Sequence, residues 1–449
     1  MKILLWHGYL LTGSGSNVYT ANIARSWRGA GHDVFLMCQE RSEDLGFIDE
    51  VGDFDESNRS FKTDSTGVPA STGRCTLVRP AIGSILPVYV YDEYKHFTAK
   101  TFVELTEEEL AGYTERNVTA LKSALEAFEP DVVVTGHEVM GPYIAASAEI
   151  DVGYSAKLHG SALEYAVKKQ ERYLRFAETG LSNATVVIGG SKYMVEAAAA
   201  VIPGWRDKAV VINPGCDVDI FRPRQRSGQT IPLVGYIGKL IAQKGVHRLL
   251  AAIAAIDTRP LKVVIVGYGG DEDDLRALAE ALLKGDVERA QMIARDLNDD
   301  EVVRFLDELG PRAKVAHLDV EIEFTGRLEH GPLAELLPTF DVLAVPSILP
   351  EAFGMVAAEG AACGVLPVVP DHSGIGEAGA AVESAIGRPG FLTYDSVDPV
   401  PGLGAAIERV LALPAEERAD LGAKAVGLAR SRWSWDEVAR SLLEASTPR

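Results

Sequence analysis

Residues 346–360 read Pro-Ser-Ile-Leu-Pro-Glu-Ala-Phe-Gly-Met-Val-Ala-Ala-Glu-Gly and follow the apolar run at 341–345, Asp-Val-Leu-Ala-Val. This order predicts a buried strand, a tight loop and a helix that begins at about Phe353. A helix start presents unpaired N–H groups and the positive end of the helix dipole, which suit a phosphate. Glu351 lies in the predicted loop and Glu359 near the second helical turn. Carboxylates beside an anion site suit the hydroxyls of a sugar and a ribose, whereas a solvent-facing glutamate pair is the alternative interpretation.

Strand-like runs alternate with helical stretches along almost the whole chain. In the first half we predict strands at 2–6, 33–38, 131–135, 155–158, 185–188 and 209–212. In the second half we predict strands at 232–237, 262–266, 321–324, 342–345 and 366–369. Several of these runs are almost entirely apolar, as is typical of parallel strands covered on both faces. Strands separated by helices imply βαβ units, so we predict an α/β protein with doubly wound, Rossmann-like sheets.

The length of 449 residues exceeds that of one compact core and predicts two domains of about 200 residues each. Pro, Gly and Asp cluster at 213–223 before a new strand, so we expect one Rossmann-like domain over 1–213 and a second over 214–430. Such domains would face each other across a cleft where ligands bind. We expect the acidic segment 41–79 to be a long surface excursion and the charged segment 282–309 to be an inserted helical hairpin.

Composition excludes several classes of function. The formal net charge of −20 argues against nucleic acid as a partner and against strong attachment of the whole molecule to an anionic membrane. The four cysteines lie far apart without metal-ligand spacing, so we expect them to be reduced and buried. The chain shows neither a signal peptide nor an apolar run of the roughly 18 residues needed for a membrane span. We therefore expect a cytoplasmic protein without a transmembrane segment.

Two loops carry residues suited to an anion. The glycine-rich loop 13–17 lies between the first predicted strand and a helix at 18–28, where backbone can approach a ligand. It lacks the GxGxxG pattern, which argues against an NAD-dependent oxidoreductase. A later loop carries Lys239 and Lys244, which are suited to neutralise a diphosphate, although two solvated lysines fit the same pattern.

Histidines follow three of the predicted strands. His7, His137 and His159 each lie where a strand reaches the carboxyl edge of its sheet. A histidine in that position either donates to a ligand hydroxyl or is satisfied by the backbone, and the sequence leaves both interpretations open.

Taken in order, these motifs resemble the retaining glycosyltransferases of family 4, which have the GT-B fold of two Rossmann-like domains. The family's two glutamates, separated by seven residues with Phe-Gly after the first, stand here at 351–359. The segment 213–223 resembles its Asn-Gly-Val-Asp segment, and 238–245 resembles its Gly-Arg-Leu to Lys-Gly loop. Trp-Asp-Glu-Val at 435–438 resembles the start of the closing helix. The resemblance therefore implies a C-terminal helix at about 431–449 that crosses back to the first domain.

The resemblance also implies roles for individual residues. Those expected to bind the donor are Gly15, Lys239, Lys244, Arg327, Leu328, Glu351, Phe353, Gly354, Met355 and Glu359. In this set the lysines hold the diphosphate, Glu351 and the amides after it hold the sugar and phosphates, and Glu359 holds the ribose. Those expected to be catalytic are His159, Lys244 and Glu351. Those expected to face the acceptor are His7, Asn17 and His137. Lys239 stands where the family usually has Arg, so bidentate phosphate contact is lost there.

The activity implied is transfer of a sugar from a nucleoside-diphosphate sugar, with UDP favoured, to a hydroxyl of a small-molecule acceptor. Front-face displacement with retention is implied, with the departing phosphate accepting the acceptor's proton and with no metal or other cofactor. A nucleotide-sugar epimerase or phosphorylase of the same fold, a non-catalytic relative and a lipid-linked acceptor remain alternatives. The basic, aromatic segment 164–176 fits either a solvated helix face or a peripheral contact with lipid.

Overall fold

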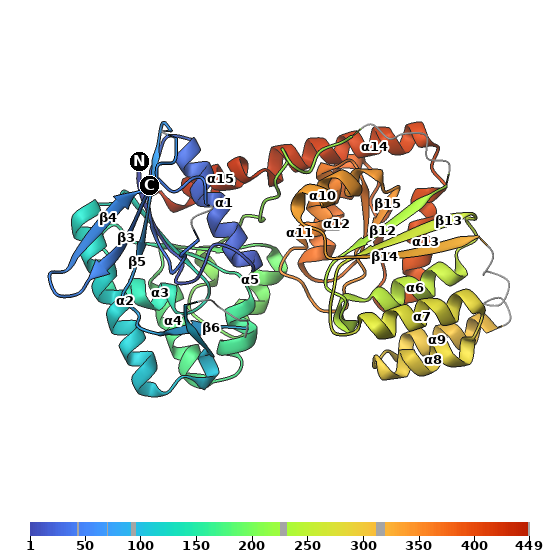
Figure 1. The fold of residues 1–449 in the computed structure, drawn as a ribbon, viewed down its shortest axis with the longest axis horizontal. Coiled ribbons are helices and arrows are strands. Elements are labelled where there is room, and N and C mark those ends of the chain that lie inside the picture. Colours follow the sequence, from blue (N-terminus) through green and yellow to red (C-terminus); the bar gives the residue numbers. More distant parts are fainter. Residues whose placement is uncertain (43–44, 70, 91–95, 225–230, 311–318, 448–449) are drawn as a thin grey trace. The chain divides into compact units, whose positions relative to one another are not determined.

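The computed structural model describes residues 1–42, 45–69, 71–90, 96–224, 231–310 and 319–447. The chain divides into two compact units. Unit 1 comprises Met1–Pro214 and Trp435–Arg449, and unit 2 comprises Gly215–Ser434. Strands and helices alternate in both units (Figure 1). The predicted α/β class with doubly wound parallel sheets is confirmed.

Unit 1 is built on a nine-stranded sheet in the order β11-β10-β9-β8-β1-β2-β5-β3-β4. Among the strands of this sheet that the structure describes, only β3 and β4 pair antiparallel. The sheet strands are β1 (Lys2–Trp6), β2 (Asp33–Met37), β3 (Glu50–Asp55), β4 (Ser60–Ser65), β5 (Arg74–Arg79), β8 (Val132–Gly136), β9 (Ser155–Lys157), β10 (Val186–Gly189) and β11 (Ala209–Val211). A separate two-stranded sheet is formed by β6 (Ile85–Val88) and β7 (Thr98–Thr101).

Helices cover the sheet of unit 1. They are α1 (Gly15–Gly29), α2 (Glu107–Phe128), α3 (Gly141–Ala148), α4 (Glu171–Asn183), α5 (Lys192–Ala199) and α15 (Trp435–Ser446). Ile3 and Leu5 alternate with Leu4 along β1 and point into a core that α1 and α15 complete. In that core the indole N–H of Trp27 donates to the carbonyl of Ala439 at 2.9 Å. The last helix is therefore an integral part of unit 1, and α1 and α15 lie side by side (Figure 1).

Unit 2 has a six-stranded parallel sheet in the order β14-β13-β12-β15-β16-β17. Its strands are β12 (Leu233–Ile237), β13 (Leu261–Val266), β14 (Val320–Gly326), β15 (Val342–Ala344), β16 (Leu366–Pro370) and β17 (Thr393–Tyr394). Its helices are α6 (Val246–Ala255), α7 (Glu272–Lys284), α8 (Val287–Asp296), α9 (Asp300–Leu309), α10 (His330–Leu336), α11 (Met355–Ala362), α12 (Ser373–Ile386), α13 (Pro399–Leu411) and α14 (Ala415–Leu428). The apolar strand residues 263–266 are buried between helices on both faces, as their composition predicts.

The elements agree with the sequence in most places. Every predicted strand is present, with ends that differ by at most two residues. The helical hairpin expected within 282–309 is confirmed as α8 and α9. The helix expected at about Phe353 begins two residues later, as α11.

Two expectations were wrong. The described part of 41–79 is not a surface excursion, because β3, β4 and β5 in this segment extend the main sheet. β5 pairs with β2 and buries Cys75, Leu77 and Val78. The segment 164–176 is not one helix, because Gln170 is extended (φ −144°, ψ 129°) between a π-helical turn at Leu163–Val167 and the start of α4.

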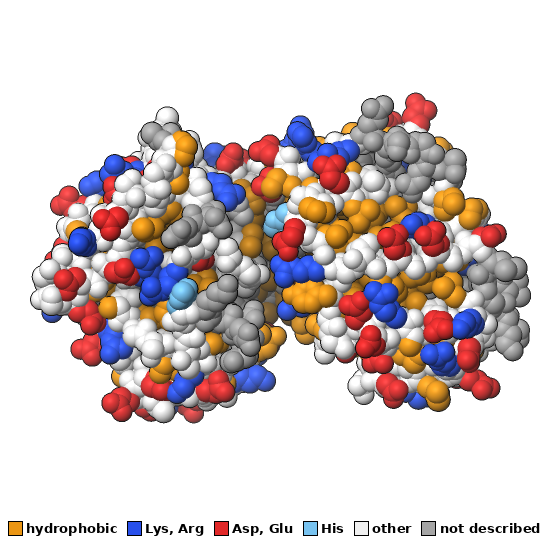
Figure 2. All heavy atoms as spheres, viewed as in Figure 1, with side chains coloured by type: hydrophobic (Ala, Val, Ile, Leu, Met, Phe, Trp, Pro, Cys, Tyr) orange, Lys and Arg blue, Asp and Glu red, His pale blue; other side chains and the backbone are white. Residues whose placement is uncertain are grey.

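The surface carries charged side chains of both signs (Figure 2). On the face shown in Figure 2, acidic and basic side chains are intermixed over both units and form no continuous basic stripe. Among the described residues, no helix combines the length and the apolar character needed to cross a bilayer.

Candidate functional site

The candidate residues of unit 1 gather at the carboxyl edge of its sheet. His7 follows β1, His137 follows β8 and His159 follows β9. The ring centroids of His137 and His159 are 4.7 Å apart, and those of His137 and His7 are 5.6 Å apart. Ligands of doubly wound sheets bind at this edge, so the three histidines form the centre of the candidate site in unit 1.

His7 and Asn17 are bonded to each other. The Asn17 Oδ1 lies 2.9 Å from the His7 Nε2, and the other ring nitrogen of His7 lies 3.1 Å from the Thr20 hydroxyl. The side chains of His7 and Asn17 are buried, and the Asn17 amide also donates to the Thr12 carbonyl at 2.6 Å. The hydrogen bonds of His7 and Asn17 thus hold both side chains in fixed positions.

His137 has no such partners. Its ring is buried between Tyr9 and Tyr89, with centroid distances of 5.4 Å and 4.7 Å. Neither ring nitrogen has a hydrogen-bond partner among the residues that the structure describes. A buried polar group without a partner costs about 1–3 kcal/mol, so a ligand hydroxyl would recover a substantial interaction here.

Burial keeps the histidine cluster neutral. Desolvation lowers the pKa of His7 to about 4 and holds the pKa values of His137 and His159 well below their usual range. A neutral imidazole offers one donor and one acceptor nitrogen. The cluster is therefore suited to hydroxyl groups, which both donate and accept.

The first turn of α1 offers an anion site in the same unit. Gly15 is its first residue and is exposed, and the Ser14 side chain accepts from the Asn17 N–H at 3.4 Å. The first turn carries no acidic residue that would compete with an anion.

In unit 2, Lys244 and Glu351 form an ion pair, with 2.7 Å between the Lys244 Nζ and the Glu351 Oε1. Their side chains retain exposures of 29% and 19%, so both stay accessible to a ligand. The loop that carries Lys244 packs on the loop before Glu351, because the amides of Ile348 and Leu349 donate to the Gln243 carbonyl.

Helix α11 begins directly after this pair. Gly354 caps it in the left-handed conformation (φ 93°), with no side-chain cap and no acidic residue in the first turn. The N–H groups of the first helical turn, at Met355 and Val356, are thus available to an anion, whereas the Ala357 N–H donates to the Gly354 carbonyl. Glu359 lies one turn further on, half-buried, and burial raises its pKa to about 8.

The other donor candidates of unit 2 follow β12 or β14 or directly precede α11. Lys239 is exposed and forms no ion pair with any residue described. Arg327 is exposed beside Glu329, at 3.2 Å, and lies 5.6 Å above the Tyr268 ring. Leu328 and Phe353 pack into the core of unit 2, so their side chains are structural.

Sequence reasoning missed several polar residues of both sites. In unit 1, Glu138 and Lys157 are buried, and desolvation raises the pKa of Glu138 to about 7 and lowers that of Lys157 to about 7. In unit 2, Ser373 at the start of α12 accepts from the Glu351 N–H at 3.1 Å. The sequence signal for Lys157 is its position: it is a lysine inside a buried strand, two residues before His159.

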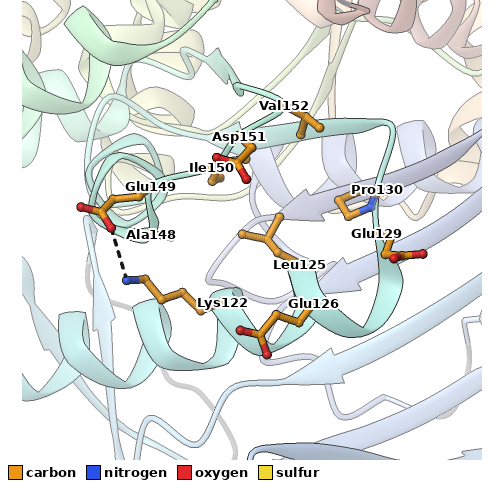
Figure 3. Close-up of a pocket in the computed structure, with 10 residues that line it drawn as sticks. All are labelled: Lys122, Leu125, Glu126, Glu129, Pro130, Ala148, Glu149, Ile150, Asp151 and Val152. Carbon is orange, nitrogen blue, oxygen red and sulfur yellow. Dashed lines mark ion pairs between the residues drawn. The ribbon is translucent and has the colours of Figure 1, made fainter.

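A separate pocket of about 410 Å³ lies elsewhere in unit 1 (Figure 3). It is formed where α2 and α3 end and Pro130 leads into β8, which is the opposite edge of the sheet from the histidines. Lys122 and Glu149 pair across it at 4.0 Å. None of the candidate site residues lines this pocket.

Sequence models of two families match the chain. A glycosyl transferase 4-like domain matches residues 14–215, and glycosyl transferases group 1 matches residues 217–307 and 303–426. The D-inositol 3-phosphate glycosyltransferases of Mycobacterium bovis and Mycobacterium tuberculosis are 29% identical over 241 residues, which is 52% of this chain and 42% of each relative. The match therefore spans less than half the length of these curated relatives.

Solved structures are similar over both units. Sucrose-phosphate synthase of Thermosynechococcus elongatus has a TM-score of 0.58 at 19% identity, covering 99% of this chain and 97% of that chain. Anabaena HepE in complex with UDP has a TM-score of 0.60 at 17% identity, covering 99% of both chains. These structures show the GT-B fold. The two family matches together span most of the sequence and show that the chain belongs to the family 4 glycosyltransferases.

Proposed function

We propose that the protein transfers a sugar from a nucleoside-diphosphate sugar to a hydroxyl of a small-molecule acceptor. A UDP-sugar is the favoured donor, because HepE, which has the same fold, is known in complex with UDP, with UDP and glucose, and with UDP-glucose. The curated relatives are glycosyltransferases named for D-inositol 3-phosphate, a small polyhydroxylated molecule, which supports a soluble acceptor.

One observation carries the proposal: the pairing of Lys244 with Glu351 beside the uncapped start of α11. A diphosphate requires fixed positive charge, which Lys244, the exposed Lys239 and the helix N–H groups supply. A sugar requires acceptors for its hydroxyls, which Glu351 supplies. A lysine or arginine alone would bind any anion. A cation beside a carboxylate can bind a sugar joined to phosphate, because the cation binds the phosphate and the carboxylate accepts from the sugar hydroxyls.

The reaction that we propose retains the anomeric configuration. The bond between the anomeric carbon and the donor phosphate oxygen breaks, and the acceptor oxygen bonds to the same face of that carbon. The acceptor's proton passes to the departing phosphate oxygen. Lys244, Lys239 and the start of α11 stabilise the negative charge that develops on this phosphate, and the proposal includes no metal ion.

Residues of unit 1 would serve the sugar and the acceptor in this proposal. His159 would donate to a hydroxyl of the transferred sugar, and His137 would bond to the acceptor through its unpartnered ring nitrogens. His7 and Asn17 would hold the acceptor site in shape. Gly15 would bring the backbone at the start of α1 to the donor phosphates, and Glu359 would bind the ribose.

Slow donor hydrolysis without acceptor tests this function. A panel of UDP-, GDP- and ADP-sugars would be incubated with the wild type, with Lys244→Ala and with Lys424→Ala, which removes an exposed lysine of α14. We expect one nucleoside diphosphate to be released, with kcat/KM lowered about 100-fold in Lys244→Ala, as for loss of a charge-assisted contact to the leaving group. Lys424→Ala should match the wild type.

The contrary results are equally clear. Conversion of the sugar without nucleotide release would indicate an epimerase instead. If calorimetry detects no binding of any nucleotide sugar, the proposed donor class is wrong.

A further inference from the structure

Two buried charged residues lie beside His159 and have no part in the proposed reaction. Glu138 directly follows His137 and is fully buried. Lys157 is the last residue of β9, two residues before His159, and is 3% exposed. Burying an ionised group is costly unless it is paired and hydrogen-bonded, so a pair of such residues at one site calls for an explanation.

Glu138 is bonded to the turn that carries His159. Its Oε1 accepts from the Gly160 N–H at 2.7 Å, and Gly160 adopts the left-handed conformation (φ 88°). The other carboxyl oxygen of Glu138 has no hydrogen-bond partner among the residues described. The carboxyl thus reaches from the end of β8 to the end of β9 and holds the backbone at His159 and Gly160.

Lys157 and His159 contact the same aromatic ring, that of Tyr19. The Lys157 Nζ donates to the Ile212 carbonyl at 3.2 Å and lies 5.2 Å from the centre of the Tyr19 ring. The Tyr19 ring in turn meets the His159 ring edge-on at 5.3 Å. The charges of Lys157 and Glu138 attract each other, and each favours the ionised form of the other.

We propose that Glu138 is a positioning residue for His159, with Lys157 as its buried counter-charge. A neutral side chain could bond to the Gly160 amide, but a carboxylate makes a shorter bond of about twice the strength. Such a bond restrains the turn so that the His159 ring keeps one position against Tyr19. This inference rests on the proposed function only in naming His159 as the group that needs to be positioned.

The test compares three variants with the wild type. Glu138→Ala removes the bond to Gly160. The double variant Glu138→Gln/Lys157→Met removes both charges and keeps an oxygen that can accept from Gly160. Glu149→Ala, at an exposed glutamate of the same unit, is the control.

Three readouts are taken: donor hydrolysis, UDP binding by calorimetry, and the ring signal of His159 in ¹⁵N-histidine NMR spectra, assigned with His159→Gln. We expect Glu138→Ala to lower kcat about 100-fold with KM within about twofold, as for a misplaced catalytic group, and to shift or broaden the His159 signal. UDP affinity should stay within about twofold, because the diphosphate residues of unit 2 are untouched. The double variant should recover kcat to within about fivefold and restore the signal.

The inference is wrong if Glu138→Ala leaves both kcat and the His159 signal unchanged. It is also wrong if the folded double variant restores neither. If the wild type neither cleaves nor binds any donor, the proposed function fails, and the NMR comparison alone still decides whether Glu138 positions His159.

Discussion

Burial raises the pKa of the Glu359 carboxyl to about 8, so most of this group is protonated at neutral pH. Ribose hydroxyls donate more strongly to a carboxylate than to the neutral acid. If Glu359 binds the ribose, a bound nucleotide lowers this pKa and binding releases a proton. Affinity for UDP should then rise with pH while the free carboxyl is protonated and level off above about pH 8.

Calorimetry with UDP between about pH 7 and about pH 9 measures this effect. We expect about a tenfold gain in affinity in the wild type, because one pH unit below the pKa leaves about a tenth of the carboxyl ionised. Glu359→Gln cannot titrate and should show a flat profile. A flat profile in the wild type would remove Glu359 from the ribose site.

Gly245 and Gly387 offer a matched pair of glycines in unit 2. Both have a φ of 73°, but a Cβ at Gly245 would lie 1.9 Å from the Pro346 carbonyl oxygen, whereas a Cβ at Gly387 would meet nothing within 4 Å. Alanine costs about 1–2 kcal/mol at either position through its left-handed backbone. Only Gly245→Ala also pushes apart the loops that carry Lys244 and Glu351.

Urea unfolding and UDP calorimetry on both alanine variants separate the two effects. We expect both to lose stability, with the larger loss in Gly245→Ala, and only Gly245→Ala to lose UDP affinity, by about tenfold or more. Equal UDP affinity in the two variants would show that the contact of these loops does not shape the donor site.

At the scale of elements, the hairpin of α8 and α9 is joined to α6 by a buried charge cluster. The Asp299 carboxylate lies 2.7 Å from the His247 Nε2 and 2.5 Å from the Arg248 Nε. Asp299 also caps α9, accepting from the Glu301 and Val302 N–H groups. The histidine and arginine hold the pKa of Asp299 far below its usual range although burial opposes this.

Asp299→Asn should keep the cap and lose the ionic contacts, because asparagine caps helices as well as aspartate does. Breaking a buried pair typically costs about 3–5 kcal/mol, so we expect a loss of about 3 kcal/mol in the free energy of unfolding of unit 2. Asp286→Asn, at the exposed cap of α8, should change it by less than about 0.5 kcal/mol. Similar losses in both variants would show that the cluster adds nothing beyond capping.

Strands with an unbroken apolar run are the elements most readily predicted from the sequence. The strand at 263–266 is one of these, because a strand buried on both faces needs apolar residues at every position. β3 and β4 could not be recognised, because they lie at the edge of the sheet and read Glu-Val-Gly-Asp-Phe-Asp and Ser-Phe-Lys-Thr-Asp-Ser. Their pairing depends on β5 lying beside β2, which is a tertiary contact that local composition does not encode.

The residues of the candidate site also divide into those that the sequence could predict and those that it could not. The three histidines could be named because each follows a strand, and Glu351 and Glu359 because they lie on either side of the start of a helix. The bond of Glu138 to Gly160 could not, because it joins loops 22 residues apart through a turn geometry absent from the sequence pattern. The roles of the named residues stay predictions until the donor assays are done.

At the scale of the molecule, membership of family 4 and the GT-B fold were predicted from the sequence and are confirmed. Strands and helices alternate over the whole chain, so the fold class can be predicted even when single elements, such as the edge strands, are missed. The net charge is −20, and on the face shown in Figure 2 the acidic side chains are scattered among basic ones.

Unit 1 takes its last helix from beyond unit 2, and this has a consequence for synthesis on the ribosome. The core that buries Trp27 lacks α15 until the roughly 220 residues of Gly215–Ser434 have been translated. At about 5–20 residues per second, the apolar face of α1 waits about 10–45 s for its partner. Unit 2 can close its sheet in that interval. Unit 1, which is synthesised first, therefore completes its core last, and the apolar face of α1 stays exposed to solvent until α15 has been made.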